Sequence, residues 1–600
     1  MSVGIMSASQ GSYTRAQLLL DLTQGARIAS SAYANARAPA LSLRTLGGGG
    51  VVVGWAAARR RAEDAPQLLR PGLLAASIPG GGGYAGIAGS DDLDGVVAAG
   101  REGAIATVSL GSAATLTARI AALLLSRPLV VADLAGGGEG YAQLRALSAA
   151  RSPRELLIVL QRAPSGHGHE LLWSGVAGLA GGGGRELTSN STNQRGLITS
   201  IDVAPTILDH LRLAPLPSDI RGDPLHGDGA LHSSSLRGLM ARLQVIGGRR
   251  LRALAFLLCA WGLLLLCAAP WPRARAAAMR AGGLGVLWAP VVVLLGAALE
   301  PSAPVEYTII ALACMLLGAL TDQLLPWPRA PLAPAIVAVV VLVADALSGT
   351  QLLMRSLLGP DPILGARFYG IGNELKSGLA VLVLAALAAA LYPLGPREAA
   401  QSARRRRAPL IVAVAGVLLA AVEGSARLGA GVGGVILVSA GFAVAAVLLL
   451  PGALSRRRTL VVLMAPVAGL VALAALDLAT AHGSGHFTGS ILHARSAGDV
   501  RDVIVRRYKA AWGELHNHAM PVATLLALLA AYFGLRRPRR LLAPVSGDIA
   551  WLAAFAGGLT AGVVGALSED SGPVLLVVAV FALGCLSAYL WGRPGPPAAR

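Results

Sequence analysis

Charged residues are scarce in this chain. Asp, Glu, Lys and Arg make up only 14% of its 600 residues, whereas 54% are hydrophobic and the mean hydropathy is +0.62. A soluble globular protein usually has about 25% charged and about 45–50% apolar residues. Folding in water would leave much of this apolar surface unburied. The composition therefore excludes an ordinary soluble protein and places part of the chain in lipid.

Cysteine is also scarce. The four cysteines, Cys259, Cys267, Cys314 and Cys585, all lie inside apolar runs, and none has a histidine partner at zinc-ligand spacing. This pattern argues against structural disulfides and against a metal site built on cysteine. We expect the four to be small apolar filling residues.

Only two lysines, Lys376 and Lys509, occur, so the formal net charge of +19 comes almost entirely from arginine. These arginines cluster in short segments between apolar runs, which is typical of membrane topology signals rather than of a groove for phosphates. We therefore predict no nucleic-acid partner. The expected partners are membrane lipids and a lipid-linked envelope precursor.

Apolar runs of membrane-spanning length recur from Leu251 almost to the C-terminus, whereas residues 1–245 have an ordinary composition rich in Gly and Ala. A transmembrane helix needs about 20 predominantly apolar residues. The chain therefore divides into an N-terminal domain, residues 1–245, and a polytopic all-α transmembrane bundle, residues 246–600. Hydropathy predicts about eleven spans: 251–270, 281–299, 305–321, 330–348, 377–395, 409–424, 430–451, 459–478, 519–535, 547–567 and 573–592.

The segments between the predicted spans alternate in charge. Every second segment carries an arginine excess, and the segments between them are acidic or mixed. The positive-inside rule then places the basic segments and the C-terminus in the cytoplasm, and the domain 1–245 with the long loops 349–376 and 479–518 outside the cytoplasmic (plasma) membrane. The inverse topology would place five arginine-rich segments outside. The basic residues are Arg273, Arg275, Arg280, Arg329, Arg397, Arg404 to Arg407, Arg456 to Arg458, Arg536, Arg537, Arg539, Arg540 and Arg593.

An outside location of residues 1–245 requires an export signal. Residues 1–10 contain neither a basic segment nor an apolar run of sufficient length for one. We therefore expect the true start of the protein to lie upstream, so that this domain is truncated at its N-terminus.

The N-terminal domain has an α/β pattern. Residues 104–108, 128–132 and 156–160 are continuous apolar runs typical of buried strands, and helical patterns cover roughly 111–126 and 139–150. This alternation predicts a doubly wound parallel sheet.

One stretch of this domain carries a family resemblance. Residues 195–211 (RGLITSIDVAPTILDHL) predict a strand entering a helix, with Asp202 as its cap and Pro205 in its first turn, and residues 220–225 (IRGDPL) follow. The segment resembles the C-terminal part of the alkaline phosphatase/sulfatase superfamily, and the resemblance covers about residues 100–230. The resemblance implies a phosphatase-like fold that binds two metal ions through Asp and His clusters.

The chain departs from that family at the metal ligands. The strand ending at Leu160 is followed by Gln161-Arg162 instead of an Asp-His pair, and Asp133 stands alone after the preceding strand. Divalent ions need several converging ligands. We therefore predict a degenerate, non-catalytic domain, a pseudoenzyme without a cofactor; a divalent metal is the alternative.

Polar residues gather in four places that the predicted topology puts on the outer face. Ionisable residues at membrane level are costly and mark functional sites, unless they only pair and hold helices together. Glu423 and Arg427 lie four residues apart, and the 499–512 part of the long loop resembles a basic amphipathic helix. The candidate residues are Arg367, Tyr369, Asn373 and Glu374; Glu423 and Arg427; His486, Arg495 and Arg506; and Glu569 and Asp570.

An outer-face site with arginines and carboxylates suits an anionic, lipid-linked substrate, because arginine binds phosphate groups bidentately. The leading hypothesis is a cell-envelope glycan or lipid-headgroup transferase in which Arg367, Arg495 and Arg506 bind phosphate and Glu374 or Glu423 is the general base. One alternative is a transporter or flippase of an envelope precursor, which the glycine-rich break at 429–434 would suit. Another is a membrane-anchored metal-dependent phosphatase or sulfatase.

Overall fold

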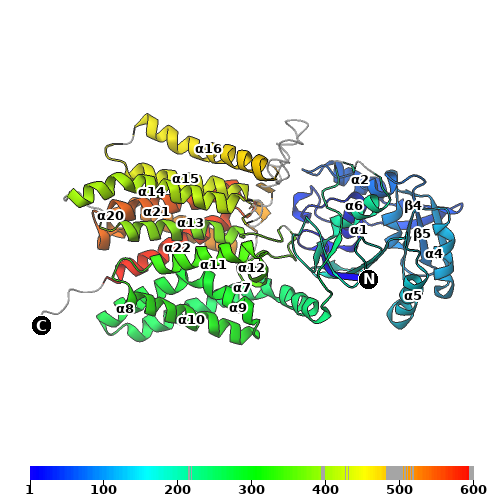
Figure 1. Cartoon of the computed structure of the whole chain (residues 1–600), viewed down its shortest axis with the longest axis horizontal. Helices are drawn as coiled ribbons and strands as arrows, with labels where there is room; N and C mark the ends of the chain where they lie inside the picture. The colour runs from blue at the N-terminus through cyan, green and yellow to red at the C-terminus, as the bar shows by residue number, and fades with distance from the viewer. Residues whose placement is uncertain are drawn as a thin grey trace. The chain divides into compact units, whose positions relative to one another are not determined.

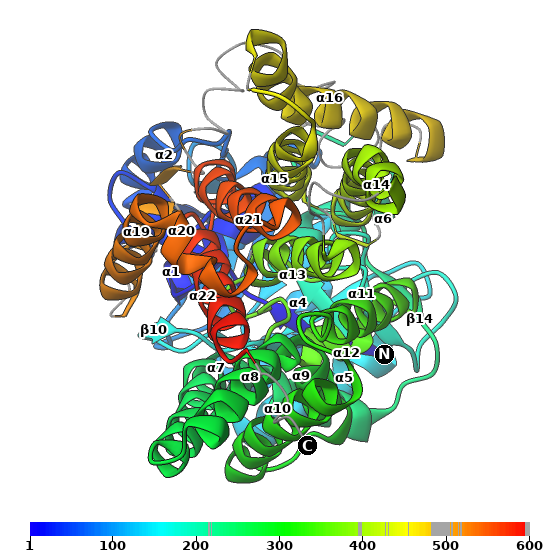
Figure 2. The same ribbon diagram turned by 90° about the vertical axis from the view of Figure 1, so that its left-hand side faces the viewer.

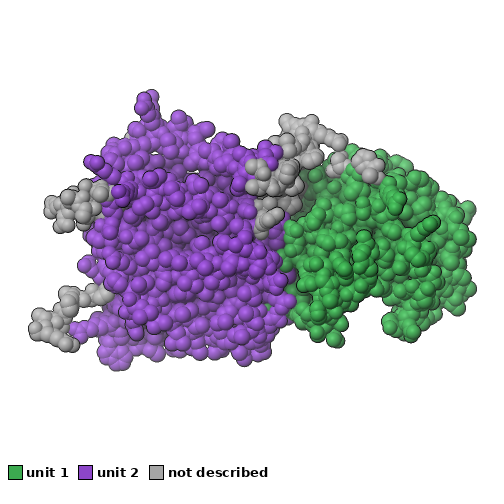
Figure 3. All heavy atoms as spheres, viewed as in Figure 1, with its two compact units in different colours: residues 1–244, 361–368 green, residues 245–360, 369–600 purple. Residues whose placement is uncertain are grey.

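The computed structural model divides the chain into two compact units, which Figure 3 shows in different colours. The first contains Met1–Gln244 with Asp361–Phe368, and the second contains Val245–Pro360 with Tyr369–Arg600. The first unit thus includes eight residues that the sequence analysis assigned to a loop of the membrane part. The structure describes all residues except 214, 215, 218, 366, 394–398, 426, 427, 430, 454, 482–504, 506, 507, 510, 514, 517, 518 and 594–600.

The first unit has an α/β fold, as predicted, and its largest sheet is built around β1 (Ser2–Ser7). Ile5 and Met6 of this strand are completely buried. β1 pairs antiparallel with β11 and parallel with β12 and β13, so the sheet is mixed. Its other strands are β9 (Leu157–Leu160), β11 (Leu172–Ala177), β12 (Glu186–Thr188), β13 (Leu197–Thr199) and β14 (His226–Asp228).

A second sheet of this unit is entirely parallel. Its central strand β5 (Gly82–Ile87) pairs with β7 (Thr107–Gly111) and β8 (Leu129–Ala132). β8 corresponds to the predicted strand at 128–132, whereas the predicted strand at 104–108 is divided between the start of β7 and β6 (Ala104–Ile105), which lies in another sheet. The third predicted strand is β9, which lies in the first sheet and pairs antiparallel with β11. The prediction of one doubly wound sheet was therefore wrong, because an apolar run does not specify which sheet a strand joins or in which direction.

Helices and small sheets complete the first unit (Figure 1). In α4 (Leu116–Leu124), the buried residues Leu116, Ile120 and Leu123 recur at helical spacing and form an apolar stripe. The remaining elements are α1 (Arg15–Gln24), α2 (Trp55–Glu63), α3 (Leu73–Ala76), α4 (Leu116–Leu124), α5 (Gly137–Ala150) and α6 (Val203–His210), the sheet of β3 (Ser42–Leu46), β4 (Gly49–Val53) and β6 (Ala104–Ile105), and the pair β2 (Tyr13–Thr14) and β10 (His167–Gly168).

Asp202 lies where the sequence predicted a helix cap, but its contacts differ. Its carboxylate accepts hydrogen bonds from the backbone N–H of Thr199 at 2.9 Å and from Ser189 Oγ at 2.8 Å, and not from the N–H groups of α6. It therefore closes a capping box over the single turn at Ser200–Asp202 that precedes α6.

The second unit is helical (Figure 1). Its first helix, α7, is longer than the predicted span at 251–270 and contains the boundary between the two units. The helices are α7 (Ser233–Ala268), α8 (Pro272–Leu287), α9 (Ala289–Leu299), α10 (Ala303–Leu324), α11 (Leu332–Leu347), α12 (Gln351–Arg355), α13 (Asn373–Leu391), α14 (Ala399–Gly424), α15 (Val432–Leu449), α16 (Arg456–Ala481), α19 (Met520–Arg536), α20 (Pro538–Leu541), α21 (Ile549–Ser568) and α22 (Pro573–Trp591).

Within the described part of the chain, eight helices are long and apolar enough to cross a membrane. A ninth candidate is the pair α8 and α9, which is bent by 58°. The predicted spans at 330–348 and 519–535 are the shorter apolar helices α11 and α19. All eleven predicted segments are therefore helical, and several apolar helices make the chain compatible with a multi-pass membrane protein; the number eleven stays a prediction.

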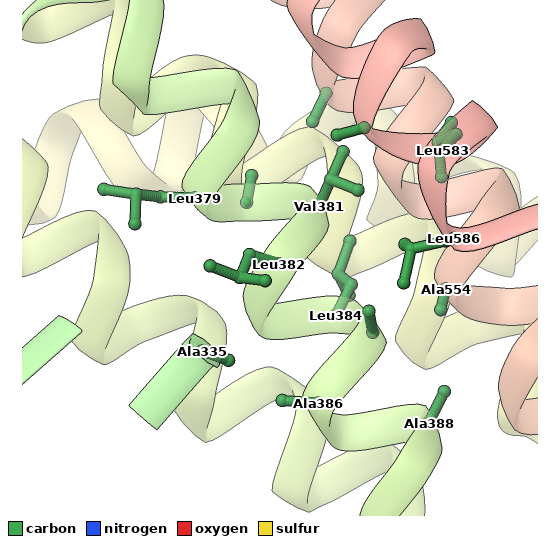
Figure 4. Packing of buried hydrophobic residues seen from close by; sticks show 14 of the residues in the cluster. Ala335, Leu379, Val381, Leu382, Leu384, Ala386, Ala388, Ala554, Leu583 and Leu586 are labelled. Atoms are coloured by element: carbon green, nitrogen blue, oxygen red, sulfur yellow. The ribbon is translucent and has the colours of Figure 1, made fainter. Parts of the chain in front are cut away.

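Helix α13 lies at the centre of this unit. Figure 2, viewed along the helices, shows it surrounded by α11, α14, α15, α21 and α22. Leu379, Val381, Leu382 and Leu384 of α13 are buried, and Figure 4 shows this helix next to Leu583 and Leu586 of α22. A helix that is apolar on all sides belongs in such a central position. The start of α13 is thereby held in place by its neighbours.

Candidate functional site

Polar residues of α13, of α14 and of the connection between α21 and α22 meet at one end of the helical unit. α13 and α15 begin at this end, α14 ends there, and the connection between α21 and α22 passes through it. Hydrogen bonds between side chains join the start of α13 to the connection between α21 and α22. Three of the four predicted polar constellations, those around residues 373, 423 and 569, therefore form one cluster.

Lys376 is at the centre of this cluster and is completely buried. Its Nζ donates to Glu569 Oε1 at 2.5 Å and to Asn373 Oδ1 at 2.9 Å. Glu569 is 7% exposed. A buried ion pair of this kind is stable only when further hydrogen bonds satisfy both charges, and Asn373 supplies one of them.

Three glycines at the start of α15 make room for these side chains. A Cβ atom on Gly431 would overlap with Lys376 Nζ, and one on Gly433 would overlap with the carboxyl group of Glu569. A Cβ on Gly434 would lie 2.6 Å from Glu423 Oε2 and 3.3 Å from Lys376 Cδ. The glycine-rich segment is therefore needed to admit one lysine and two glutamates to the same place.

Glu423, near the end of α14, is also completely buried. Its backbone carbonyl accepts a hydrogen bond from Gly431 N–H at 3.0 Å, which fixes the turn between α14 and α15. Its carboxylate packs on Gly434, beside the side chain of Lys376. Among the described residues, this buried carboxylate therefore contributes to the charge around Lys376.

Asn373 links the lysine to the connection between α21 and α22. Its Nδ2 donates to Asp570 Oδ1 at 2.7 Å and to Ser571 Oγ at 2.9 Å, while its Oδ1 accepts from Lys376. One amide side chain at the first position of α13 therefore joins a cation, a carboxylate and a hydroxyl. These contacts hold the start of α13 against that connection.

Glu374 follows Asn373 and is the accessible carboxylate of α13. Its side chain is 35% exposed, and its Oε1 lies 3.3 Å from Arg250 Nη1 of α7. Arg250 Nη2 also donates to the carbonyl of Gly359 at 2.7 Å. The bond to Gly359 therefore holds the guanidinium next to Glu374.

The cluster is rich in negative charge. Among the described residues, its contacts join two cations, Arg250 and Lys376, with four carboxylates, those of Glu374, Glu423, Glu569 and Asp570. With all six ionised, their net charge is −2.

The remaining predicted residues lie elsewhere. Arg367 belongs to the first unit, whereas Tyr369 belongs to the second and is buried. Arg427, His486, Arg495 and Arg506 lie outside the described residues, as does most of the predicted amphipathic helix at 499–512.

The sequence analysis missed two members of the cluster, Lys376 and Arg250. Lys376 is one of only two lysines in the chain and directly precedes a predicted span, a position that marks it as unusual. For Arg250 there was no comparable signal, because arginines are frequent next to spans. Only the contact with Glu374 reveals its role.

The first unit has a separate group of charged residues after β5 and β8. The sequence suggested that Asp133 stands alone, but in the structure it has partners. Its Oδ2 accepts a hydrogen bond from Tyr84 Oη at 2.7 Å and lies 2.9 Å from Arg162 Nη2. Burial, followed by a hydrogen bond with Asp94, raises the pKa of Asp133 to about 7. Arg15 and Arg162 both pair with Asp94, at 2.6 and 3.0 Å.

This second group is held together by arginines. Among the described residues, no group of three or more His, Cys, Asp and Glu side chains is arranged to hold a metal ion. Guanidinium groups instead approach the carboxylates Asp94 and Asp133.

Comparison of the chain with models of protein families, with curated proteins and with solved structures finds no match. The functional assignment therefore depends on the residues and their geometry.

Proposed function

We propose that this chain is a membrane enzyme of the cell envelope that transfers a group from an anionic, lipid-linked substrate to a hydroxyl acceptor. The observation that carries this proposal is the accessible carboxylate of Glu374, positioned by Arg250 at the end of the helical unit where the polar residues gather. An end of a helical bundle is where the head group of a lipid-linked substrate is found.

The proposed chemistry assigns one role to each group. Glu374 takes the proton of the acceptor hydroxyl as that oxygen attacks the phosphorus, and the bond from phosphorus to the leaving oxygen breaks. The negative cluster around Lys376 suits the uncharged acceptor. Arg250 would bind the phosphate oxygens together with Arg495 and Arg506, which the sequence proposes for this role and which lie outside the described residues.

The distribution of arginine supports an outer location for this site. Helix α14 runs from Arg404–Arg407 near its start to Glu423 near its end, and α22 runs from the cluster towards Arg593. The arginine-rich ends are thus opposite to the cluster along these helices. By the positive-inside rule we place those ends in the cytoplasm and the cluster at the outer face of the cytoplasmic membrane.

The test compares two glutamate variants in the full chain. Membranes with the wild-type chain should produce a modified lipid or glycan that mass spectrometry of the lipid extract detects, and Glu374→Gln should reduce its yield by about 10²-fold or more. Glu300→Gln is the matched control, because Glu300 also pairs with an arginine, Arg355, at 2.8 Å and similar exposure. Full activity of Glu374→Gln would reject this assignment.

A second candidate function is transport of an envelope precursor. It is favoured by the complete burial of Lys376 and Glu423 beside the break between α14 and α15, because buried ionisable groups at broken helices are typical of ion-coupled carriers. In proteoliposomes, a carrier would move a lipid-linked precursor across the bilayer, and Lys376→Met would stop this movement. Flux that persists in Lys376→Met would exclude coupling through this lysine.

A further inference from the structure

The connection between α19 and α21 concentrates positive charge. Residues 536–540, which we call the arginine turn, read Arg-Arg-Pro-Arg-Arg and include the end of α19 and the start of the short helix α20. Helix α21 follows and runs for 20 residues, a length of about 30 Å, before Glu569 of the polar cluster. The arginine turn is therefore at the opposite end of the helical unit from the polar cluster (Figure 1).

The backbone of the arginine turn is fixed by the segment that follows it. Leu542 and Val545 are buried in the core of the helical unit. Nε1 of Trp591, the last residue of α22, donates to the carbonyl of Leu541 at 3.0 Å. Pro538, in the first turn of α20, restricts the backbone further. The arginine turn thus has a defined backbone conformation before any ligand binds.

The four arginine side chains of the turn converge without acidic partners. All four are exposed, and together with Pro538 they line one open pocket of about 480 Å³. Within the described part of the chain, none of them forms an ion pair with Asp or Glu. Asp548, the next acidic residue along the chain, instead caps α21 with its Oδ1. Because like charges in one pocket repel each other, an anion bound there would be stabilised.

An exposed apolar surface leads to the arginine turn. Helix α19 has one buried residue, Ala527, whereas Tyr532 and Phe533 in its last two turns are 49% and 58% exposed. The guanidinium of Arg536 lies 5.1 Å from the ring centroid of Tyr532. Aromatic side chains next to arginines are typical of the boundary between the hydrocarbon core and the lipid head groups. Acyl chains that pack along α19 would therefore place a head group beside the arginine turn.

We propose that the arginine turn binds the phosphate group of an anionic phospholipid whose acyl chains pack along α19. Guanidinium groups bind phosphate bidentately, and basic pockets next to membrane helices recognise anionic head groups. The apolar and cationic surfaces are continuous, and a free phosphate ion would use only the cationic one. A topology signal requires the charge of these arginines but no shared pocket. The site is independent of the transfer and transport functions proposed above.

The test measures lipid binding to the full chain by native mass spectrometry. Released from nanodiscs that contain phosphatidylcholine and phosphatidylglycerol in equal parts, the wild-type chain should retain mainly phosphatidylglycerol. Arg539→Gln/Arg540→Gln should weaken the apparent affinity for phosphatidylglycerol about tenfold or more, the size expected for the loss of two arginines near an anionic head group. Because both side chains are exposed, the unfolding midpoint should stay unchanged.

Arg456→Gln/Arg457→Gln is the matched control. These two arginines are also exposed at the end of an apolar helix, α16, but they do not line the pocket, so this variant should bind phosphatidylglycerol like the wild type. An equal loss of affinity in both double variants would overturn the proposal, because the arginines would then act only through their summed charge. So would wild-type affinity in Arg539→Gln/Arg540→Gln. Displacement of the lipid by millimolar inorganic phosphate would overturn the assignment to a phospholipid in favour of a free anion.

Discussion

Replacement of Lys376 by methionine tests whether the buried cluster is one electrostatic unit. Methionine keeps most of the apolar volume of the side chain and removes the ammonium group. Glu569 then loses its partner at 2.5 Å, and Asn373 Oδ1 loses its donor at 2.9 Å, in a place where Lys376 is completely buried. Removal of one partner of a buried ion pair typically costs about 3–5 kcal/mol. We expect a loss of that size in the free energy of unfolding.

The double variant Lys376→Met/Glu569→Gln separates the ion pair from packing. Neutral replacement of both partners of a buried pair is often without cost, so the double variant should be more stable than Lys376→Met alone by about 2 kcal/mol or more. The assay is reversible unfolding of the full chain in mixed micelles, followed for the wild type, both single variants and the double variant.

Arg355→Met is the control, because it removes a paired cation from the same unit at a more exposed position. Its pair with Glu300 is about 30% exposed, with side-chain values of 31% and 29%, so we expect a loss of about 1 kcal/mol or less. The reasoning would be refuted if the double variant were as unstable as the sum of the single variants, because Lys376 and Glu569 would then not interact.

Three further predictions concern other features of the chain. Gly434→Ala should destabilise the helical unit by about 1–3 kcal/mol, because the added Cβ would be too close to Glu423. Gly584→Ala is the control and should not destabilise it, because nothing lies within 4 Å of a Cβ added there. Equal unfolding midpoints of the two variants would contradict the packing at Gly434. Burial raises the pKa of Asp21 from its ordinary 3.8 to about 7, so the folded state binds a proton more tightly than the unfolded state. The unfolding temperature should therefore fall as the pH rises from about 4 to about 7. Asp21→Asn should reduce this fall, and an unchanged slope in that variant would contradict the role of Asp21. In a chain without native cysteines, a cysteine at His169 should react with an impermeant thiol reagent from outside the cell and one at Ser455 only after the membrane is opened; the reverse result would invert the topology.

Local properties of the sequence were sufficient for part of the fold. An apolar run long enough to span lipid is helical wherever it lies, and all eleven predicted segments are helices. The predicted strands at 128–132 and 156–160 and the helix at 139–150 exist, with ends shifted by up to two residues. The strand β1 was not predicted, although it is central, because its six residues SVGIMS mix small polar and apolar side chains.

Long-range contacts could not be read from the sequence in the same way. Asn373, Glu423 and Glu569 were each predicted as site residues, but their meeting depends on which helix ends adjoin, and this is decided by the packing around α13. The same applies to Lys376, whose burial against Gly431 and Gly434 has no local signature. Nor does the sequence reveal that the predicted phosphate ligand Arg367 belongs to a segment, Asp361–Phe368, that is part of the first unit.

The sequence by itself thus determined which segments are helical and apolar, where the α/β part ends, and which polar residues stand next to the spans. These properties depend on side-chain hydrophobicity and charge over a few turns of chain. Only the tertiary structure decided that Lys376, Glu423 and Glu569 share one buried place, that Arg250 pairs with Glu374, and that Arg27 donates to the carbonyl of Gly365. Each of these contacts joins residues far apart in the chain, and its stability comes from burial and mutual charge, which no single segment possesses alone.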